Sequence, residues 1–179
     1  MTTYLVAAIL IVFAIAIFLL FGAVIELYRG LEQVRKDTGS YDSPIALEMD
    51  LPKRLPESAG LPDDLLRQDR GLILVLSDRC STCGTIAEHL AGSVPLSTWL
   101  LFAPQSVESG QEWLARFSLD GDSRVLLDDG TVSKSVGVNI TPAVLRVREG
   151  TVVAAHTLPS GRRLDDELAW LRKEAEVLS

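Results

Sequence analysis

The sequence predicts an α/β domain, with a central mixed sheet and helices on both faces, behind one N-terminal transmembrane helix. Three observations carry this prediction. Short apolar runs alternate with amphipathic segments of helical spacing, which is typical of parallel strands covered by helices. Two β-branched runs then flank Glu149-Gly150, a pair that favours an antiparallel hairpin. Near the N-terminus, no charged residue occurs from Leu5 to Ile25.

This uncharged run predicts the membrane helix. As a helix, it spans roughly the 30 Å of a bilayer core. A cleaved signal peptide would have a basic start and a small-residue cleavage site, and this sequence has no such start and no convincing site. We therefore expect a retained anchor over residues 4–28, after a short N-terminus of residues 1–3, and the membrane bilayer as a partner.

The charged residues indicate on which side of the membrane the folded domain lies and which partners it can bind. Arg29, Arg35 and Lys36 follow the anchor, so the positive-inside rule taken alone places the next domain in the cytoplasm. A lone CxxC pair occurs in reducing and in oxidising compartments, so the cysteines leave the side open. The net charge of −7, without a basic stripe, argues against nucleic acid as a partner.

The chain after the anchor begins as a connection. Residues 29–44 are expected to form a juxtamembrane helix and linker, and residues 45–178 the folded domain. Four prolines fall between Ser43 and Leu65, and the last of them, Pro62, opens a short helix together with two acidic residues.

Two strand–helix pairs follow. Gly71–Ser77 is an apolar run too short for a typical helix, and it predicts a strand buried on both faces. Residues 83–92 have helical spacing and end at a glycine. Leu96–Ala103 repeats the strand pattern, and residues 106–119 repeat the helix.

The last part of the chain changes this pattern. Arg124–Gly130 predicts a third short strand that ends in an Asp-Gly turn, and residues 131–138 predict a helix of one or two turns. The strands of the Glu149-Gly150 hairpin should be antiparallel. A final amphipathic helix is expected from Leu164 to Val177.

Both cysteines lie at the junction between the first strand and its helix. Cys80 and Cys83 are three positions apart, and in the first helical turn this spacing brings two sulfurs within bonding distance. The unpaired N–H groups and the dipole of a helix N-terminus stabilise a thiolate. We therefore interpret Cys80 as the attacking thiolate and Cys83, one turn inward, as the thiol that resolves the mixed disulfide.

The neighbours of the cysteines should tune their reactivity. Arg79 favours a thiolate at the adjacent residue, whereas Asp78 opposes it. Ser81 and Thr82 are small and polar, and they leave the first turn accessible. These residues do not tell an oxidase from a reductase or an isomerase, so the direction of electron flow stays open.

The cysteine pair has two other interpretations. Buried cysteines also pack as small hydrophobic residues without chemistry. A closed zinc site needs about four ligands, and the chain has only two histidines, His89 and His156, of which His89 points away from the pair on a helix. No metal site is therefore expected, and a two-thiolate copper(I) site is the metal-binding alternative.

The order of strand, "DRCSTC", helix, strand, helix, strand, short helix, "NITPAVLRV", hairpin and terminal helix resembles the thioredoxin superfamily over Ile45 to Leu178. The likeness is closest to membrane-anchored bacterial thioredoxin-like proteins of the cytochrome c maturation and methylamine-utilisation types. It implies a thioredoxin-like fold and a thiol-disulfide oxidoreductase that acts on protein thiols and disulfides. No cofactor is implied besides the redox-active disulfide Cys80–Cys83.

The resemblance also implies roles for a second segment. Thr141 and Pro142 match the family's threonine-proline pair, whose proline is cis and which faces the cysteines and binds the substrate by strand addition. The sequence departs from the family at Arg79, where a bulky apolar residue is frequent, and between the cysteines, where no proline occurs. Leu74 stands where thioredoxin has a buried acid. The group that accepts the proton of the resolving thiol Cys83 therefore stays open between Glu88, Asp78 and water.

Localisation and partners follow from the same resemblance. It favours an extracytoplasmic domain on a single-pass membrane protein, against the charge rule, and a membrane electron carrier that resets the cysteine pair. The alternatives are a non-enzymatic thioredoxin-like binding protein, acting as a copper(I) chaperone or as an assembly subunit of a membrane complex, and a structural subunit without thiol reactivity.

Overall fold

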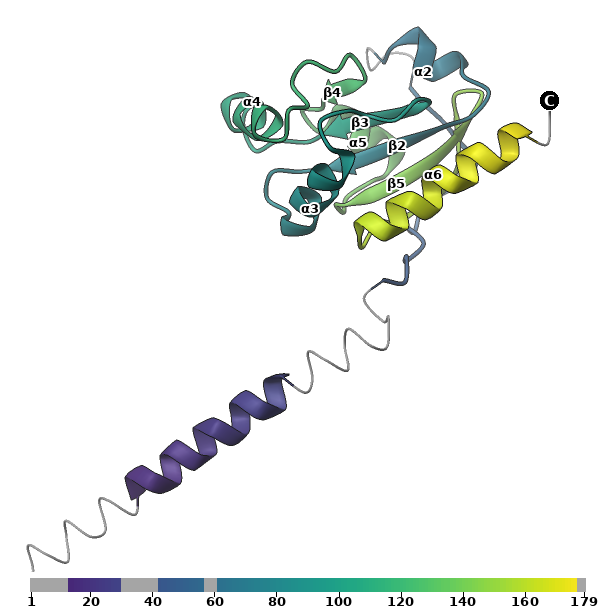
Figure 1. Ribbon diagram of the computed structural model, residues 1–179. Helices are drawn as coiled ribbons and strands as arrows, with labels where there is room; N and C mark the ends of the chain where they lie inside the picture. Colours follow the sequence, from purple (N-terminus) through teal and green to yellow (C-terminus); the bar gives the residue numbers. More distant parts are fainter. Residues whose placement is uncertain (1–12, 30–41, 57–60, 177–179) are drawn as a thin grey trace, which may run out of the picture. The chain divides into compact units, whose positions relative to one another are not determined.

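The computed structural model describes residues 13–29, 42–56 and 61–176. The chain divides into two compact units at Ser43. In the first unit, residues 13–29 form a helix (Figure 1). None of the helices in the described ranges combines the length and the apolar character needed to cross a membrane. Part of the predicted anchor, residues 4–12, lies outside the described residues, as do residues 1–3 and 30–41.

The second unit is built on a six-stranded sheet in the order β1-β6-β5-β2-β3-β4. The central strand β2 (Gly71–Leu76) pairs in parallel with β3 (Thr98–Phe102), which pairs in parallel with β4 (Val125–Leu127). On its other side β2 pairs antiparallel with β5 (Ala143–Arg148). The sheet is therefore mixed, as predicted.

The antiparallel half is a hairpin of β5 and β6 (Thr151–Thr157). Its turn uses Glu149 and Gly150, with φ of +47° and +69°, and a Cβ atom on Gly150 would lie 2.6 Å from the Leu66 carbonyl oxygen. Only glycine fits there, so the turn that the sequence predicted is also fixed by close packing.

The outer edge of β6 has a further pairing that was not predicted. The two-residue strand β1 (Lys53–Arg54) pairs antiparallel with it, and Ala46 forms an isolated bridge with His156. The stretch that the sequence presents as a proline-containing connection therefore covers the edge of the sheet.

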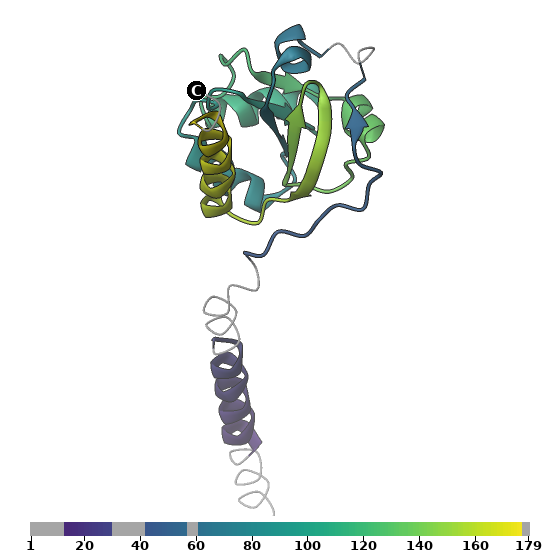
Figure 2. The same ribbon diagram turned by 90° about the vertical axis from the view of Figure 1, so that its right-hand side faces the viewer.

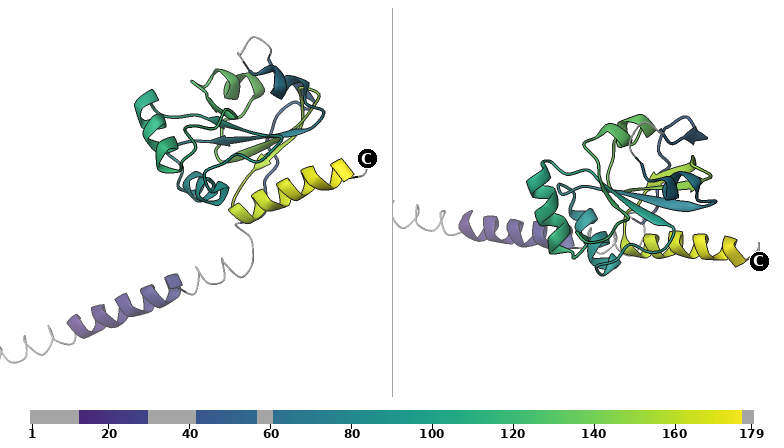
Figure 3. Two further views of the ribbon diagram at one scale, coloured as in Figure 1. Left: turned by 45° about the horizontal axis from the view of Figure 1, so that its top comes forward. Right: turned by 90° about the horizontal axis from the view of Figure 1, so that it is seen from above.

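Helices cover both faces of the sheet (Figure 3). Side chains of α3, α4 and α6 pack on one face, and those of α2 and α5 pack on the other. This arrangement confirms the predicted helices on both faces, and together with the mixed sheet it gives the domain a thioredoxin-like α/β fold. The helices are α2 (Asp63–Arg67), α3 (Ser81–Leu90), α4 (Val107–Arg116), α5 (Thr131–Val136) and α6 (Gly161–Glu176).

Strand β2 shows why the apolar run folds at the centre. Leu72, Leu74 and Leu76 pack toward α3 and α6, whereas Ile73 and Val75 pack toward α5, and each is at most 2% exposed. Burying one such side chain contributes about 1.5–3 kcal/mol. Since both faces are covered, β2 places its carboxyl end, with the cysteines directly after it, on a rigid support.

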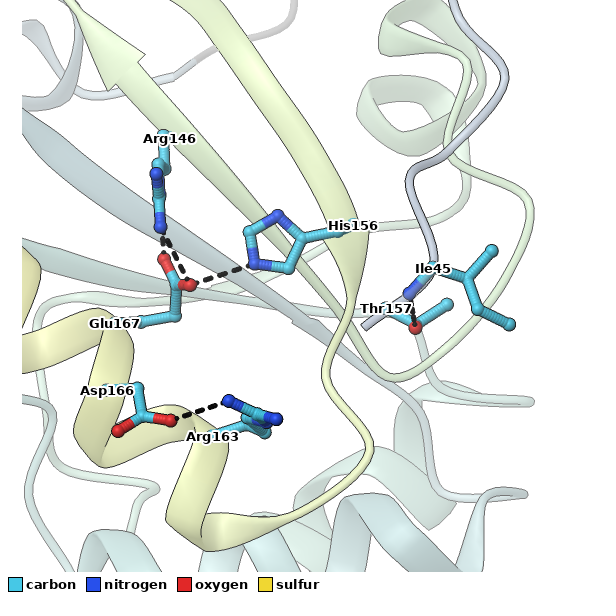
Figure 4. Close-up of polar contacts among 7 residues, drawn as sticks. All are labelled: Ile45, Arg146, His156, Thr157, Arg163, Asp166 and Glu167. Atoms are coloured by element: carbon cyan, nitrogen blue, oxygen red, sulfur yellow. Dashed lines mark hydrogen bonds and ion pairs between the residues drawn. The ribbon is translucent and has the colours of Figure 1, made fainter. Parts of the chain in front are cut away.

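A buried carboxylate fastens α6 to the hairpin, which it flanks (Figures 2 and 4). Glu167 on α6 accepts two hydrogen bonds from the Arg146 guanidinium, at 2.9 and 3.0 Å, and pairs with His156 at 2.9 Å. Arg146 also lies 4.4 Å from the centre of the Trp170 ring. The partly buried His156 is therefore hydrogen-bonded to Glu167.

Candidate dithiol site

The two cysteines begin helix α3. Cys80 is the N-cap residue with extended backbone, and its sulfur accepts the Cys83 backbone N–H at 3.2 Å. The sulfur therefore occupies the place of a capping oxygen, where the helix dipole favours negative charge. Both cysteines are free thiols in this structure.

Burial separates the two thiols. Cys80 is partly exposed, whereas Cys83 is 0% exposed and packs with the core beneath α3. Burial raises the pKa of the Cys83 thiol well above its usual range, and its hydrogen bond and charge interaction with Cys80 raise it further. Cys83 is therefore protonated at neutral pH while Cys80 remains reachable from solvent.

Thr141, which directly precedes Pro142, lies against the cysteines. The Cys80 thiol donates to the Thr141 carbonyl oxygen at 3.6 Å, and the Thr141 side chain hydrogen-bonds to Cys83, which partly opposes the effect of burial on its pKa. The Thr141–Pro142 peptide bond is cis. Four of the residues singled out in the sequence, from segments about sixty positions apart, are therefore brought together.

Cys80 opens into a pocket of ≈ 330 Å³ between α3 and α4. Arg79 and Ser81 also line it, and both are exposed, whereas Thr82 is half-buried and is not part of the lining. Glu88 lines the pocket from the exposed face of α3. The three tuning residues are thus placed differently, since two face the pocket and one does not.

Trp113 on α4 and Phe117, the residue directly after α4, form the opposite wall of this pocket. Trp113 stacks on Phe102 with ring centres 4.5 Å apart, and Phe117 lies 4.5 Å from Trp113. The sequence predicted a helix over residues 106–119, and nothing in that pattern indicated that Trp113 and Phe117 would border the pocket at Cys80.

Asp78 is turned toward α4. Its carboxylate accepts the Gln105 backbone N–H at 3.0 Å and the Ser109 hydroxyl at 2.7 Å. Asp78 was one of the candidate proton acceptors for Cys83. The hydrogen bonds that shift the pKa of Cys83 come from Cys80, the Ser77 backbone and Thr141. Sequence reasoning missed the contact with Ser109 because the two residues are 31 positions apart.

The two histidines are engaged elsewhere. His89 pairs with Asp165 at 2.9 Å and His156 with Glu167 at 2.9 Å. Within residues 13–29, 42–56 and 61–176, no cluster of three or more histidine, cysteine or acidic side chains is arranged to hold a metal ion.

A larger hollow of ≈ 630 Å³ lies between the starts of α4 and α5 and is lined by neither cysteine. The buried carboxylate of Asp128 at its border accepts the backbone N–H groups of Val132 and Ser133, both at 3.0 Å. Asp128 therefore caps the start of α5, in agreement with the turn that the Asp-Gly pair predicted. Because neither cysteine lines this hollow, the dithiol pocket remains the candidate site.

No family model matches this chain, and no curated protein matches it. Solved structures that are similar to part of this chain include the following three. A secreted disulfide oxidoreductase of Mycobacterium tuberculosis, homologous to E. coli DsbE, shares 14% identity over 66% of this chain and 84% of that chain, with a TM-score of 0.43. A putative thioredoxin from Neisseria meningitidis shares 15% identity over 75% and 93%, with a TM-score of 0.49. A thiol-disulfide isomerase from Corynebacterium glutamicum shares 17% identity over 64% and 86%, with a TM-score of 0.41.

Proposed function

We propose that this protein is a membrane-anchored thiol-disulfide oxidoreductase that acts on protein thiols and disulfides through Cys80 and Cys83. One observation carries the proposal. The partly exposed Cys80 thiol caps helix α3, and the buried Cys83 thiol lies one turn inward. The Cys83 backbone N–H donates to the Cys80 sulfur at 3.2 Å. This asymmetry suits an attacking thiol and a resolving thiol.

The exchange proceeds in two steps. The Cys80 thiolate attacks one sulfur of a substrate disulfide, an S–S bond forms between them, and the other substrate sulfur leaves as a thiolate that takes up a proton. Cys83 then loses its proton and attacks the Cys80 sulfur, the S–S bond between Cys80 and the substrate breaks, and the substrate sulfur leaves as a thiolate that takes up a proton. The substrate becomes a dithiol, and its two electrons come from Cys80 and Cys83, which form a disulfide. The reverse sequence oxidises a substrate dithiol.

The order of the steps follows from the pKa of Cys83. Burial raises this pKa first, and the hydrogen bond and charge interaction with Cys80 add to it. When the Cys80 sulfur is bound in a mixed disulfide, it carries no charge and these two contributions disappear. Cys83 therefore deprotonates more readily after the first step than before it.

The segment before β5 is proposed to bind the substrate. The Thr141 carbonyl meets the Cys80 sulfur, so a polypeptide extended along Thr141 and Pro142 would bring its own cysteine to Cys80. Ile140 is 46% exposed directly before this segment and offers an apolar contact to the same polypeptide.

The anchor and the side of the membrane belong to the proposal. The uncharged run from Leu5 to Ile25 supports an anchor over residues 4–28, and we place the domain on the extracytoplasmic face, where a membrane electron carrier would reset the disulfide. In intact cells, a membrane-impermeant maleimide should then label Cys80 after reduction. Labelling only after the cells are lysed would place the domain on the cytoplasmic face.

Trapping tests the enzyme proposal. In the Cys83→Ser variant the second step is blocked, so mixed disulfides between Cys80 and other proteins should accumulate on non-reducing gels and disappear with dithiothreitol. The double variant Cys80→Ser/Cys83→Ser is the matched control and should give no adducts. If Cys83→Ser gives none either, and the native protein does not reduce insulin or oxidise a dithiol, the domain is a binding or structural module.

A further inference from the structure

The carboxylate of Asp78 joins the loop that carries Cys80 to the start of α4. Its two oxygens lie 3.2 and 3.0 Å from the Gln105 backbone nitrogen, and Oδ2 accepts the Ser109 hydroxyl at 2.7 Å. Its partners lie 27 and 31 positions further along the chain. Asp78 therefore links the ends of two neighbouring parallel strands, β2 and β3.

The loop from Ser77 to Cys80 is closed by short-range hydrogen bonds. The Ser77 hydroxyl accepts the Arg79 N–H at 3.3 Å and donates to Asp78 at 3.4 Å, and the Cys80 N–H donates to the Ser77 carbonyl at 3.4 Å. Ser77 itself is buried. A displacement of the Asp78 side chain would therefore reach the backbone of Cys80.

The partner on α4 is also well fixed. Ser106 and Ser109 form a capping box with two reciprocal hydrogen bonds of 3.1 Å, and a helix N-terminus stabilises a nearby carboxylate. Burial raises the pKa of Asp78, but the hydrogen bonds from Gln105 and Ser109 outweigh it, so the pKa lies below its usual value. An ionised carboxylate thus meets preformed donors.

We infer that Asp78 is a positioning residue, whose hydrogen bonds to Gln105 and Ser109 hold Cys80 where its sulfur meets the Cys83 N–H. The inference rests on the proposed role of Cys80 as the attacking thiol. A role through charge alone makes the opposite prediction, because a carboxylate near Cys80 disfavours a thiolate. Asp78→Asn and Asp78→Ala distinguish the hydrogen-bonding role from the charge role, because asparagine keeps an acceptor oxygen without the charge.

The rate at which iodoacetamide alkylates Cys80 at pH 8 tests this role of Asp78. The measurement uses the full-length chain with Cys83→Ser as background, so that only one thiol reacts. Asp78→Ala and Ser109→Ala should each slow the reaction by about tenfold, because each removes a hydrogen bond to a charged group. Asp78→Asn should stay within about twofold of the background protein. Asp78→Ala/Ser109→Ala should be no slower than Asp78→Ala, because the two residues share one contact.

Ser106→Ala is the matched control, since it removes the other half of the capping box and leaves both partners of Asp78 in place. It should alkylate at the background rate. Equal slowing by Ser106→Ala and Ser109→Ala would overturn the inference, and so would equal acceleration by Asp78→Asn and Asp78→Ala. If Asp78→Ala fails to fold, the two serine variants decide alone.

The outcome is independent of the trapping experiment. Alkylation needs no partner protein, so the predicted rates together with an absence of mixed disulfides would contradict the proposed function and leave the role of Asp78 standing. Adducts together with unaltered alkylation rates in all variants would contradict the role of Asp78 alone.

Discussion

The Cys80 thiol lies 3.6 Å from the carbonyl oxygen of Thr141, although the two residues are 61 positions apart. This contact joins the start of α3 to the cis peptide bond before β5. It also means that any polypeptide bound along Thr141 meets the partly exposed sulfur first and the buried Cys83 second. In the proposed exchange, this placement makes Cys80 the attacking thiol and Cys83 the resolving thiol.

Replacing Thr141 by valine should slow the second step of exchange. Burial raises the pKa of Cys83, and the Thr141 hydroxyl lowers it through a hydrogen bond. In Thr141→Val this bond is lost, less Cys83 thiolate forms, and the mixed disulfide should persist about three- to tenfold longer, as expected for a hydrogen bond worth about 1 kcal/mol. Quenched single-turnover reactions with a model protein disulfide give this lifetime.

The control for this variant is Thr151→Val, at the start of β6. It makes the same change of side chain away from the cysteines and should leave the lifetime unaltered. An equal lifetime in Thr141→Val and the native protein would show that the hydroxyl of Thr141 does not assist Cys83.

Glu167 should make the stability of the domain depend on pH. Burial raises its pKa, but the bonds from His156 and Arg146 outweigh this and lower it from 4.5 to about 2. Because the folded pKa is the lower one, the stabilisation is present above about pH 4.5 and is lost as the pH falls toward 2. A shift of this size corresponds to about 3–4 kcal/mol.

Glu167→Gln should therefore lower the free energy of unfolding by about 3–4 kcal/mol at pH 7 and by much less near pH 2.5. Urea unfolding of the native and variant chains at both pH values measures the difference. Asp166→Asn, one position away in an exposed pair with Arg163, is the control and should have a small effect at both. A Glu167→Gln effect independent of pH would contradict this role of the carboxylate.

Much of the fold was predictable because its signals are local. The apolar run of β2, the helical spacing of α3 and the Glu149-Gly150 turn each lie within one short window of sequence, and all three are confirmed. β1 was not predicted, because two residues form it and its pairing with Val152 depends on a strand about a hundred positions later.

The site was predictable in its thiols and not in what surrounds them. The CxxC spacing and its place at a helix start identified Cys80 and Cys83 directly. The wall formed by Trp113 and the attachment of Asp78 to Ser109 depend on the packing of α4 beside α3, which no local pattern encodes. Asp78 was interpreted as a charge beside the thiol, and the structure gives it hydrogen-bond partners on another segment.

The central claim is that Cys80 and Cys83 form a redox-active pair. Titration of the full-length protein in glutathione and dithiothreitol buffers, followed by alkylation and counting of the modified thiols, tests it most directly. Both thiols should be lost together in a single two-electron transition, at a potential between about −270 and −120 mV, the range of catalytic dithiols. Two thiols that stay alkylatable in every buffer, or a pair that is reduced only below about −300 mV like a structural disulfide, would contradict the claim.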